Sequence, residues 1–162
     1  MHTKTILAAL VSAAAVQAAA LPDAPVGEKA ADCVASKKLA DGIDKNIALQ
    51  KMEQQAVGEV KKLLSADGQI DQAKFAEAKK VLVGYVNDGI KVREENQKAA
   101  QPGNPAIPGL ATVANAQKSE LQQAEGLKGT KADLAVVAQL EKEFAGGIEQ
   151  NQKNKLAAMT GC

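Results

Sequence analysis

Residues 71–100 read DQAKFAEAKKVLVGYVNDGIKVREENQKAA, and this stretch decides the fold class. Apolar and small side chains recur in it at steps of three and four residues, the spacing that collects them on one side of an α-helix. Asp71 stands just before the pattern begins, and aspartate is a preferred N-cap residue. We therefore predict an amphipathic helix that starts after Asp71. Its expected inward stripe is Phe75, Ala78, Leu82, Tyr85 or Val86, Gly89 and Arg93.

The last part of the chain shows the same kind of pattern. Residues 130–159 read TKADLAVVAQLEKEFAGGIEQNQKNKLAAM. Thr130 is a suitable N-cap, and Asp133, three residues later, is favourable near the positive end of a helix. We predict a second strong helix over this segment. Its expected inward stripe is Leu134, Val137, Leu140 or Glu141, Phe144, Ile148, Gln152, Leu156 and Met159.

A proline-rich segment lies between these two helices. Residues 101–112 read QPGNPAIPGLAT and contain three prolines and two glycines, which do not continue a helix. We predict an extended Pro/Gly-rich connector at 101–111, followed by a shorter helix from about Thr112 to Lys128. The residues expected inside that helix are Val113, Gln117, Leu121, Ala124 and Leu127.

The region from about Ala30 to Leu64 is rich in helix-forming residues, but its apolar residues fall on two faces. Leu39, Ile43 and Ile47 share the first face. The second face holds Leu49, Met52, Ala56, Val60 and Leu63. Successive residues of a helix advance by about 100°, so the two faces point in different directions. A kink or break near residues 42–46 would reconcile them, and so would one long helix that contacts different neighbours along its length.

The N-terminus has the three-part layout of a secretory signal peptide. Lys4 supplies a basic start, an apolar run follows from Ile6 to Val16, and small residues close the segment, with cleavage expected after Ala18 or Ala20. The apolar run is too short to cross a bilayer, which needs about 20 residues. We therefore expect a secreted, extracellular protein without a transmembrane anchor. The predicted divisions are a signal peptide at 1–20, a short extension at 21–30 and a single helical-bundle domain at 31–162.

The chain has two cysteines, Cys33 near the start of the first predicted helix and Cys162 at the last residue. A helix of about 30 residues spans roughly 45 Å, whereas a disulfide requires α-carbons within about 7 Å. Four helices run up and down return the chain end to its starting level, while three or five would not. Export provides the oxidising conditions that disulfides need. We predict an all-α, up-and-down four-helix bundle whose ends are tied by a Cys33–Cys162 disulfide.

Glycines fall inside the predicted helices, and each of the five named below costs roughly 1 kcal/mol relative to alanine. We expect them to allow close packing of neighbouring helices against alanines, and we expect the disulfide to offset part of their cost. These residues are Gly58, Gly84, Gly89, Gly146 and Gly147.

Composition excludes several classes of function. The only histidine, His2, is removed with the predicted signal peptide, which leaves no imidazole as general base or metal ligand. No catalytic, cofactor-binding or metal-binding residues can be assigned, so we predict a protein that is not an enzyme and needs no cofactor. Loss of Lys4 balances 19 basic against 19 acidic residues, and only three aromatic residues are present. Nucleic-acid binding is therefore not expected.

Three short motifs give the chain a family likeness: AAALP at 18–22, ADC at 31–33 and a terminal GC at 161–162. In a small, cysteine-poor chain they resemble the small secreted proteins of filamentous ascomycete fungi. The resemblance implies an effector or virulence factor that binds a host extracellular or cell-surface protein and modulates host immunity or cell death, in the apoplast if the host is a plant. The chain is also distantly similar to fungal hydrophobic-surface-binding and lipid-binding helical proteins, which implies the alternative of a carrier or coat protein. No site residues transfer from either group.

Overall fold

The computed structural model describes residues 26–162, and this part of the chain contains helices and no strands. Four α-helices make up most of it: α1 (Val26–Ser65), α2 (Gln72–Ala99), α3 (Ile107–Gly126) and α4 (Leu134–Ala158). A short 3₁₀ helix, η1 (Lys131–Asp133), leads into α4. None of the described helices is long and apolar enough to cross a membrane.

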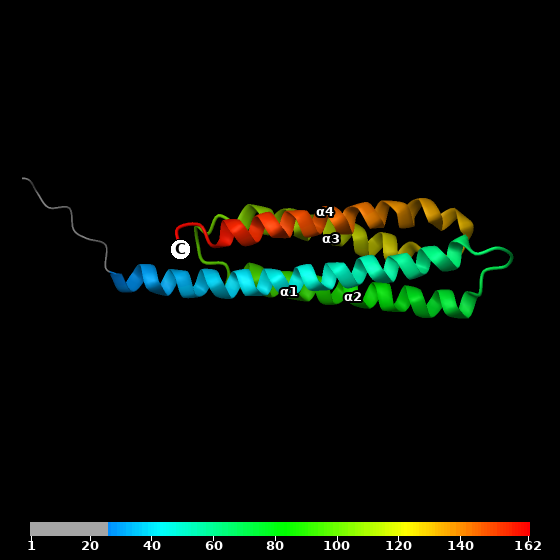
Figure 1. Cartoon of the computed structure of the whole chain (residues 1–162), viewed down its shortest axis with the longest axis horizontal. Helices are drawn as coiled ribbons and strands as arrows, with labels where there is room; N and C mark the ends of the chain where they lie inside the picture. The colour runs from blue at the N-terminus through cyan, green and yellow to red at the C-terminus, as the bar shows by residue number, and fades with distance from the viewer. Residues whose placement is uncertain (1–25) are drawn as a thin grey trace, which may run out of the picture.

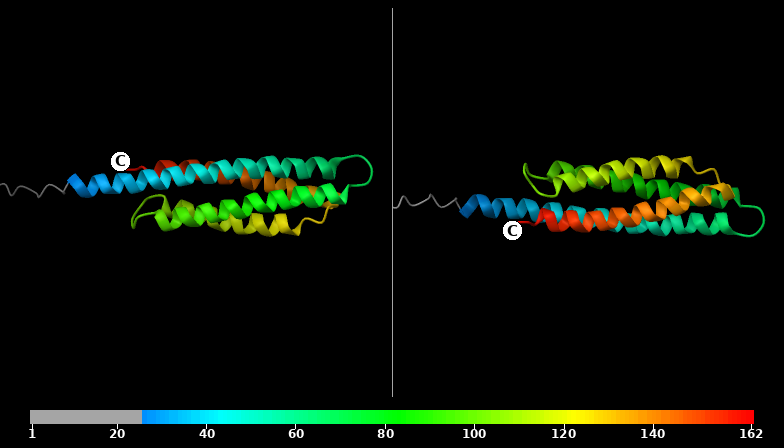
Figure 2. Two further views of the ribbon diagram at one scale, coloured as in Figure 1. Left: turned by 90° about the horizontal axis from the view of Figure 1, so that it is seen from below. Right: turned by 90° about the horizontal axis from the view of Figure 1, so that it is seen from above.

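The four α-helices run alternately up and down along one long axis (Figures 1 and 2). Helix α1 packs against α2 and α4, and α3 packs against the other sides of α2 and α4, so that α1 and α3 are diagonal partners. The first turns of α1 extend beyond the other helices, and the chain end returns beside α1 (Figure 1). The predicted all-α four-helix bundle is therefore confirmed.

The predicted start of α2 is confirmed, whereas α4 begins at Leu134, after η1, and not directly after Thr130. The carboxylate of Asp71 accepts hydrogen bonds from the backbone N–H groups of Ala73 and Lys74, each at 3.1 Å. Ahead of α4, the carboxylate of Asp133 accepts from the backbone N–H of Thr130 at 2.9 Å. These bonds satisfy N–H groups that the first turn of a helix leaves without partners.

The connector between α2 and α3 is shorter than predicted. Helix α3 begins at Ile107, with a proline in its first turn, so residues 107–111 are helical and not extended. Proline is tolerated there because the N–H it lacks would have no helical partner in the first turn. Asn104 fixes the connector: its Oδ1 accepts from the backbone N–H of Ala106 at 2.9 Å, and its Nδ2 donates to the backbone oxygen of Ala158 at 3.3 Å.

Helix α1 is a single unbroken helix, which decides between the two alternatives for this region. Its inner face is one continuous stripe whose steps alternate between four and three residues. Met52, expected inside, is 43% exposed. The second apolar face was predicted at positions rotated slightly around the helix from the face that is buried. The buried stripe is Leu39, Ile43, Asn46, Gln50, Glu53, Val57, Val60 and Leu64. Polar residues at its centre made the stripe look broken in the sequence.

The second half of α4 shows the same departure. The expected inward residues Leu156 and Met159 are 76% and 36% exposed, and Gln152 is exposed as well. Val137, Leu140 and Phe144 are buried as predicted. Beyond them the buried face continues through Gly147, Asn151, Asn154 and Ala158. The inner stripe of this helix thus changes from apolar to polar halfway along.

Most of the buried apolar residues form two separate clusters, one at each end of the bundle. The turn-end cluster, next to the α1–α2 turn, contains Ala56, Val57, Val60, Leu64, Phe75, Leu82, Val86, Ala124, Leu127, Val137, Leu140 and Phe144. The disulfide-end cluster contains Leu39, Ile43, Ile47, Ala106, Leu110 and Ala158. The space between them is filled by polar side chains, described below.

The predicted signal peptide at 1–20 lies outside the described residues, as does the first half of the predicted extension at 21–30. Residues 26–30 belong to α1, so the helix begins before the expected start near Ala30. The remainder of the predicted domain, 31–162, forms one bundle.

Candidate functional site

The two predicted site residues, Cys33 and Cys162, form the predicted disulfide. Their α-carbons are 5.3 Å apart, within the normal range for a disulfide. The bond joins the second turn of α1 to the end of the chain and closes a loop with a sequence separation of 129 residues. Its role is structural: it joins the start of the described chain to its end at one pole of the bundle.

The structure points to no metal centre among residues 26–162, where no three His, Cys, Asp or Glu side chains gather in a suitable group. His2, the only histidine, lies outside the described residues. Candidate sites must therefore be sought in the buried polar residues and in the surface recesses.

The centre of the bundle is occupied by what we name the central polar section. All four helices contribute to it, and each member is at most 5% exposed. The pattern behind it is the alternation of three- and four-residue steps, which keeps these positions on the inner face of each helix. Its members are Asn46, Gln50, Glu53, Arg93, Asn96, Gln117, Glu120, Asn151 and Asn154.

One half of the central polar section is a connected amide network. Asn151 on α4 donates from Nδ2 to Asn46 Oδ1 at 2.8 Å and to Gln50 Oε1 at 2.9 Å, both on α1. Asn46 Nδ2 donates in turn to the backbone oxygen of Gly89 on α2 at 2.8 Å. Asn154 Nδ2 donates to Asn151 Oδ1 at 3.2 Å. These bonds join three helices through groups that have lost their contact with water.

The other half contains two buried carboxyl groups that have no hydrogen-bond partners among residues 26–162. Glu53 on α1 and Glu120 on α3 are both fully buried, and neither oxygen of either group has such a partner. Burial, reinforced by the charge of Glu120, raises the pKa of Glu53 to about 8. Burial, reinforced by the charge of Glu143 on α4, raises the pKa of Glu120 to about 7. Burial dominates because it removes the water that stabilises a carboxylate.

The buried guanidinium of Arg93 does not neutralise these carboxyl groups. Its Nε donates to Gln117 Oε1 at 3.2 Å and its Nη1 donates to Gln97 Oε1 at 2.9 Å. Within the described residues, its one carboxylate contact is with Glu94, at 3.7 Å. Arg93 therefore links α2 to α3 through an amide and leaves both buried glutamates without a cation.

Helical glycines provide the space for the polar side chains. A Cβ at Gly89 would lie 2.7 Å from Glu53 Oε1 and 3.2 Å from Gln117 Nε2. A Cβ at Gly147 would collide with Gln50 Nε2. The expectation that the helical glycines pack against alanines is therefore wrong at these two positions. The other three, Gly58, Gly84 and Gly146, have open space where a Cβ would stand.

The same pairing recurs towards the disulfide pole. A Cβ at Gly42 on α1 would collide with Asn96 on α2, and a Cβ at Gly109 on α3 would collide with Asn154 on α4. Each α-helix thus contributes one glycine that receives a polar side chain from a neighbouring helix. Such complementary shapes fix which helix lies beside which, and at what height.

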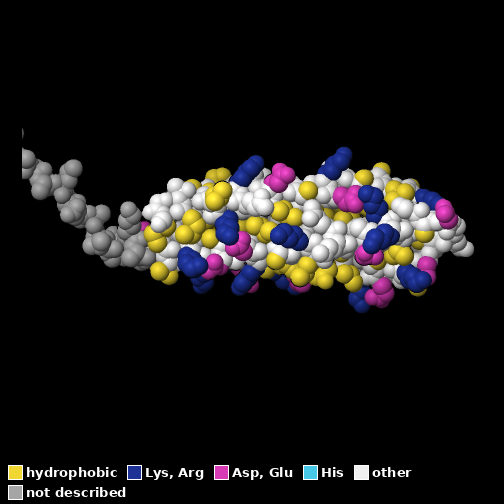
Figure 3. All heavy atoms as spheres, viewed as in Figure 1, with side chains coloured by type: hydrophobic (Ala, Val, Ile, Leu, Met, Phe, Trp, Pro, Cys, Tyr) yellow, Lys and Arg dark blue, Asp and Glu magenta, His cyan; other side chains and the backbone are white. Residues whose placement is uncertain are grey.

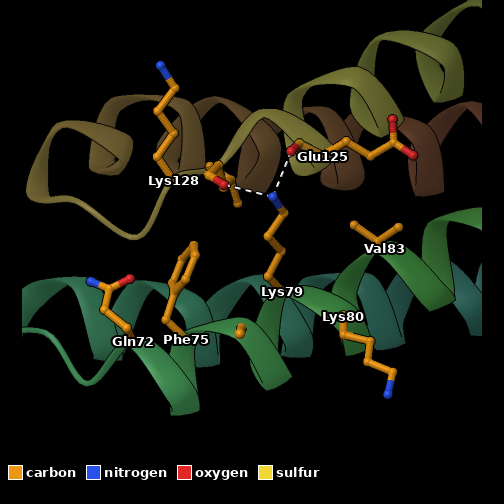
Figure 4. Close-up of a pocket in the computed structure, with 9 residues that line it drawn as sticks. Gln72, Phe75, Lys79, Lys80, Val83, Glu125 and Lys128 are labelled. Carbon is orange, nitrogen blue, oxygen red and sulfur yellow. Dashed lines mark hydrogen bonds between the residues drawn. The ribbon is translucent and has the colours of Figure 1, made fainter.

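A surface recess, the α2–α3 recess, lies at the turn end of the bundle (Figure 4). It exists because α3 ends at Gly126, so that an extended loop takes its place beside the first turns of α2. The recess has a volume of about 530 Å³, within the range of small-ligand sites. Phe75, Val83 and Leu127 supply its apolar surface.

Lys79 spans the α2–α3 recess from α2 to the end of α3 (Figure 4). Its Nζ donates to the backbone oxygen of Glu125 at 2.7 Å and to that of Leu127 at 2.8 Å. Those carbonyls lie at the negative end of a helix, where a cation is favourable. Lys80 and Lys128 point outward (Figure 4), and neither forms an ion pair within the described part of the chain. With the carboxylate of Glu125 counted as well, the rim carries a net positive charge around an apolar floor.

A second groove, of about 620 Å³, lies between α1 and α2 near the disulfide pole. Lysines and acidic residues alternate along it, with Lys38, Lys45 and Lys98 opposed by Asp41 and Glu95. The same mixture of charges covers much of the face seen in Figure 3. Because positive and negative side chains are nearly balanced in this groove, its charge distinguishes no class of ligand.

Sequence reasoning identified the disulfide but missed the buried glutamates and asparagines. Arg93 and Gln117 were placed correctly inside, because apolar neighbours on both sides fixed the stripe. Glu53, Glu120 and Asn151 were missed because polarity was taken as a sign of exposure. The alternating spacing of three and four residues, followed through polar positions, is the signal that would have found them.

Comparison of the chain with protein-family models, curated proteins and solved structures finds no match. The function must therefore be argued from the geometry described above and from the resemblance in the short terminal motifs.

Proposed function

We propose that this is a secreted, non-enzymatic binding protein that acts at the host interface as an effector, through the α2–α3 recess. The observation that carries the proposal is the recess itself, which has an apolar floor, outward-pointing lysines at its edge and Lys79 spanning it. Such a surface suits a partner protein that presents an apolar side chain flanked by acidic residues. The N-terminal signal-like segment and the disulfide support an extracellular setting.

The proposal is tested with the oxidised chain lacking residues 1–20, immobilised and exposed to host extracellular fluid. The variant Lys80→Glu/Lys128→Glu reverses the charge of the recess rim while leaving every buried contact in place. We expect proteins retained by the original chain to be lost by this variant. The matched control is Lys38→Glu/Lys45→Glu in the α1–α2 groove, which should retain them. Equal retention by all three chains would refute the recess as the contact surface.

The biological part of the proposal has its own test. A strain that lacks the gene should show weaker infection or an altered host response, and the gene for the rim variant should fail to restore it. Normal infection and unchanged host responses in the deletion strain would contradict an effector role, whatever the binding experiment shows.

One observation favours the alternative, a carrier or coat protein for lipids or hydrophobic surfaces. Four exposed large apolar side chains lie towards the disulfide pole: Val34, Ile107, Leu156 and Met159. However, a bundle that opened onto an apolar surface would bring its central polar section to that surface. Displacement of a fluorescent fatty acid decides between the two: saturable micromolar binding supports the carrier, and no binding supports a protein partner.

A further inference from the structure

The two buried carboxyl groups of the central polar section form the most costly arrangement in the bundle. Glu53 and Glu120 come from diagonal helices and approach the same region of the core, where the charge of one acts on the other. An ionised carboxylate without a hydrogen bond or a cation is strongly unfavourable in such surroundings. Each group is therefore compatible with the closed bundle chiefly in its neutral form.

The charged groups that surround this pair do not relieve it. Arg93 on α2 is occupied by Gln117 and Gln97. Glu143 on α4 adds a further negative charge, and its own carboxylate accepts hydrogen bonds from Gln123 and Gln139. No described helix that packs around the pair presents a cation to either carboxyl group. Ionisation must consequently be accommodated by movement of a helix towards water.

Helix α3 is the element best placed to move. At 20 residues it is the shortest of the four α-helices, and it does not pack against α1. A proline- and glycine-containing connector precedes it, and a loop with Gly129 at positive φ follows it. It carries Glu120 and also Gln117, whose Nε2 has no hydrogen-bond partner. Outward displacement of α3 would expose the side chains of Glu120 and Gln117 to water at the same time.

We propose that the buried Glu53–Glu120 pair makes this bundle a pH-responsive device, closed in acidic surroundings and loosened at α3 as the surroundings become neutral to alkaline. This inference does not rest on the proposed effector role. It gives the protein two states that differ in the exposure of the inner faces of α3 and its neighbours.

The direction of the pH effect follows from proton linkage. The pKa of each carboxyl is higher in the folded chain than the ordinary value of 4.5, so the folded state holds more protons than the unfolded state between pH 4.5 and about 8. Stability is then greatest at acidic pH and falls as the pH rises through this interval. The loss levels off only about one pH unit above the higher of the two pKa values, where both groups are ionised in either state.

The first experiment is urea unfolding of the oxidised chain lacking residues 1–20, at intervals from pH 5 to pH 8.5. We expect the folding equilibrium constant to fall by at least about tenfold over this range, since each carboxyl contributes up to tenfold per pH unit. In Glu53→Gln/Glu120→Gln, where the amides cannot ionise, the dependence should largely disappear. The control Glu125→Gln/Glu149→Gln, which changes two exposed glutamates, should keep the original dependence.

The location of the change is tested by hydrogen exchange of backbone amides, corrected for the intrinsic effect of pH. Between pH 6 and pH 8.5 we expect protection to fall first in α3, by about tenfold or more, before it falls in the α1–α4 pair. A uniform loss over all helices would refute α3 as the moving element.

A measurement on the unmodified chain removes any dependence on the folding of variants. Carboxyl carbons of isotopically labelled glutamates are followed by NMR as the pH is raised. We expect two glutamates, Glu53 and Glu120, to titrate at about 8 and about 7. Titration of all glutamates below pH 5.5, or a urea midpoint that does not change between pH 5 and pH 8.5, would overturn the proposal.

Discussion

The core at the turn end of the bundle is apolar, whereas the core at its middle is polar. Twelve buried apolar residues form the turn-end cluster, among them Phe144, Leu82 and Leu140, all fully buried. The middle is filled by amides, two carboxyl groups and one guanidinium, set against glycines. Removal of apolar area from water stabilises the first region, but this interaction has no preferred direction and does not fix how the helices are aligned. The second region contributes little net free energy, but its hydrogen bonds are directional.

The difference shows how one chain separates stability from specificity. Apolar stripes of similar width allow neighbouring helices to shift by a turn at modest cost, whereas the Asn151–Asn46 and Asn151–Gln50 bonds form at a single relative height. Buried polar residues fix register in coiled coils in this way, at a cost in stability. The disulfide lies beyond the polar middle, next to the smaller apolar cluster, where the added stability is most needed.

Reduction of the disulfide is expected to have the largest effect. Because the loop between Cys33 and Cys162 is long, the chain-entropy relation gives a loss of about 4–5 kcal/mol in the free energy of unfolding. Urea unfolding with and without a reducing agent measures the total. Hydrogen exchange should show that the disulfide end loses protection while the turn-end cluster keeps it. The double variant Cys33→Ser/Cys162→Ser must be insensitive to the reducing agent, and an unchanged midpoint in the original chain would contradict the role given to this bond.

Truncation of Phe144 is expected to be the next largest effect. Phe144→Ala removes a fully buried ring from the turn-end cluster and should lower the free energy of unfolding by about 3–5 kcal/mol. Leu156→Ala is the matched control on the same helix, because Leu156 is 76% exposed and should change the stability by less than about 0.5 kcal/mol. Thermal or urea unfolding measures both. A large loss in Leu156→Ala would mean that the helix is rotated relative to this structure.

Phe144 and Leu156 also mark how far the fold could be predicted from the sequence. Up to Phe144, apolar residues recur at helical spacing and indicate the buried face correctly. Beyond Phe144, the apolar residues Leu156 and Met159 were predicted to lie on the inner face, but that side of the helix is exposed. Apolar periodicity identifies a buried face only where the buried side chains are apolar. The disulfide, the number of helices and the caps could therefore be predicted from the sequence, but the central polar section could not.

The candidate recess was beyond prediction for a different reason. Its floor residues, Phe75 and Leu127, were correctly expected inside, but the recess depends on where α3 stops relative to α2. Gly126 and Gly129 indicate a turn without fixing the height at which it falls in the bundle. The bonds of Lys79 to the backbone oxygens of Glu125 and Leu127, at the end of α3, involve no local sequence pattern and follow only from the packed arrangement.

The two halves of the central polar section should respond in opposite directions to substitution. Asn151→Ala removes the donor for Asn46 and Gln50 and leaves both oxygens buried without a partner, so we expect a loss of about 2–3 kcal/mol. Glu53→Met replaces an unpaired carboxyl by an apolar side chain of similar volume and should raise the stability by about 1–3 kcal/mol at pH 8. Urea unfolding of both variants at pH 5 and pH 8 measures the difference. If both destabilise the chain equally at pH 8, the carboxyl half has partners that the structure does not show.

The smallest effects are expected at two adjacent glycines of α4, which test the fit between polar side chains and glycines most directly. At Gly147, an alanine methyl would collide with Gln50 Nε2, and Gln50 is held by its bond from Asn151, so we expect Gly147→Ala to lower the free energy of unfolding by about 1–2 kcal/mol. At Gly146 the same methyl enters open space, and the gain in helix propensity should raise it by about 0.5–1 kcal/mol. Both variants change one residue of the same helix by the same group, so differences in the unfolded chain largely cancel in urea or thermal unfolding. Equal stability of Gly147→Ala and Gly146→Ala would mean that the Gln50 side chain can move away without a loss of stability. Gly147 would then not determine the height of α4 relative to α1.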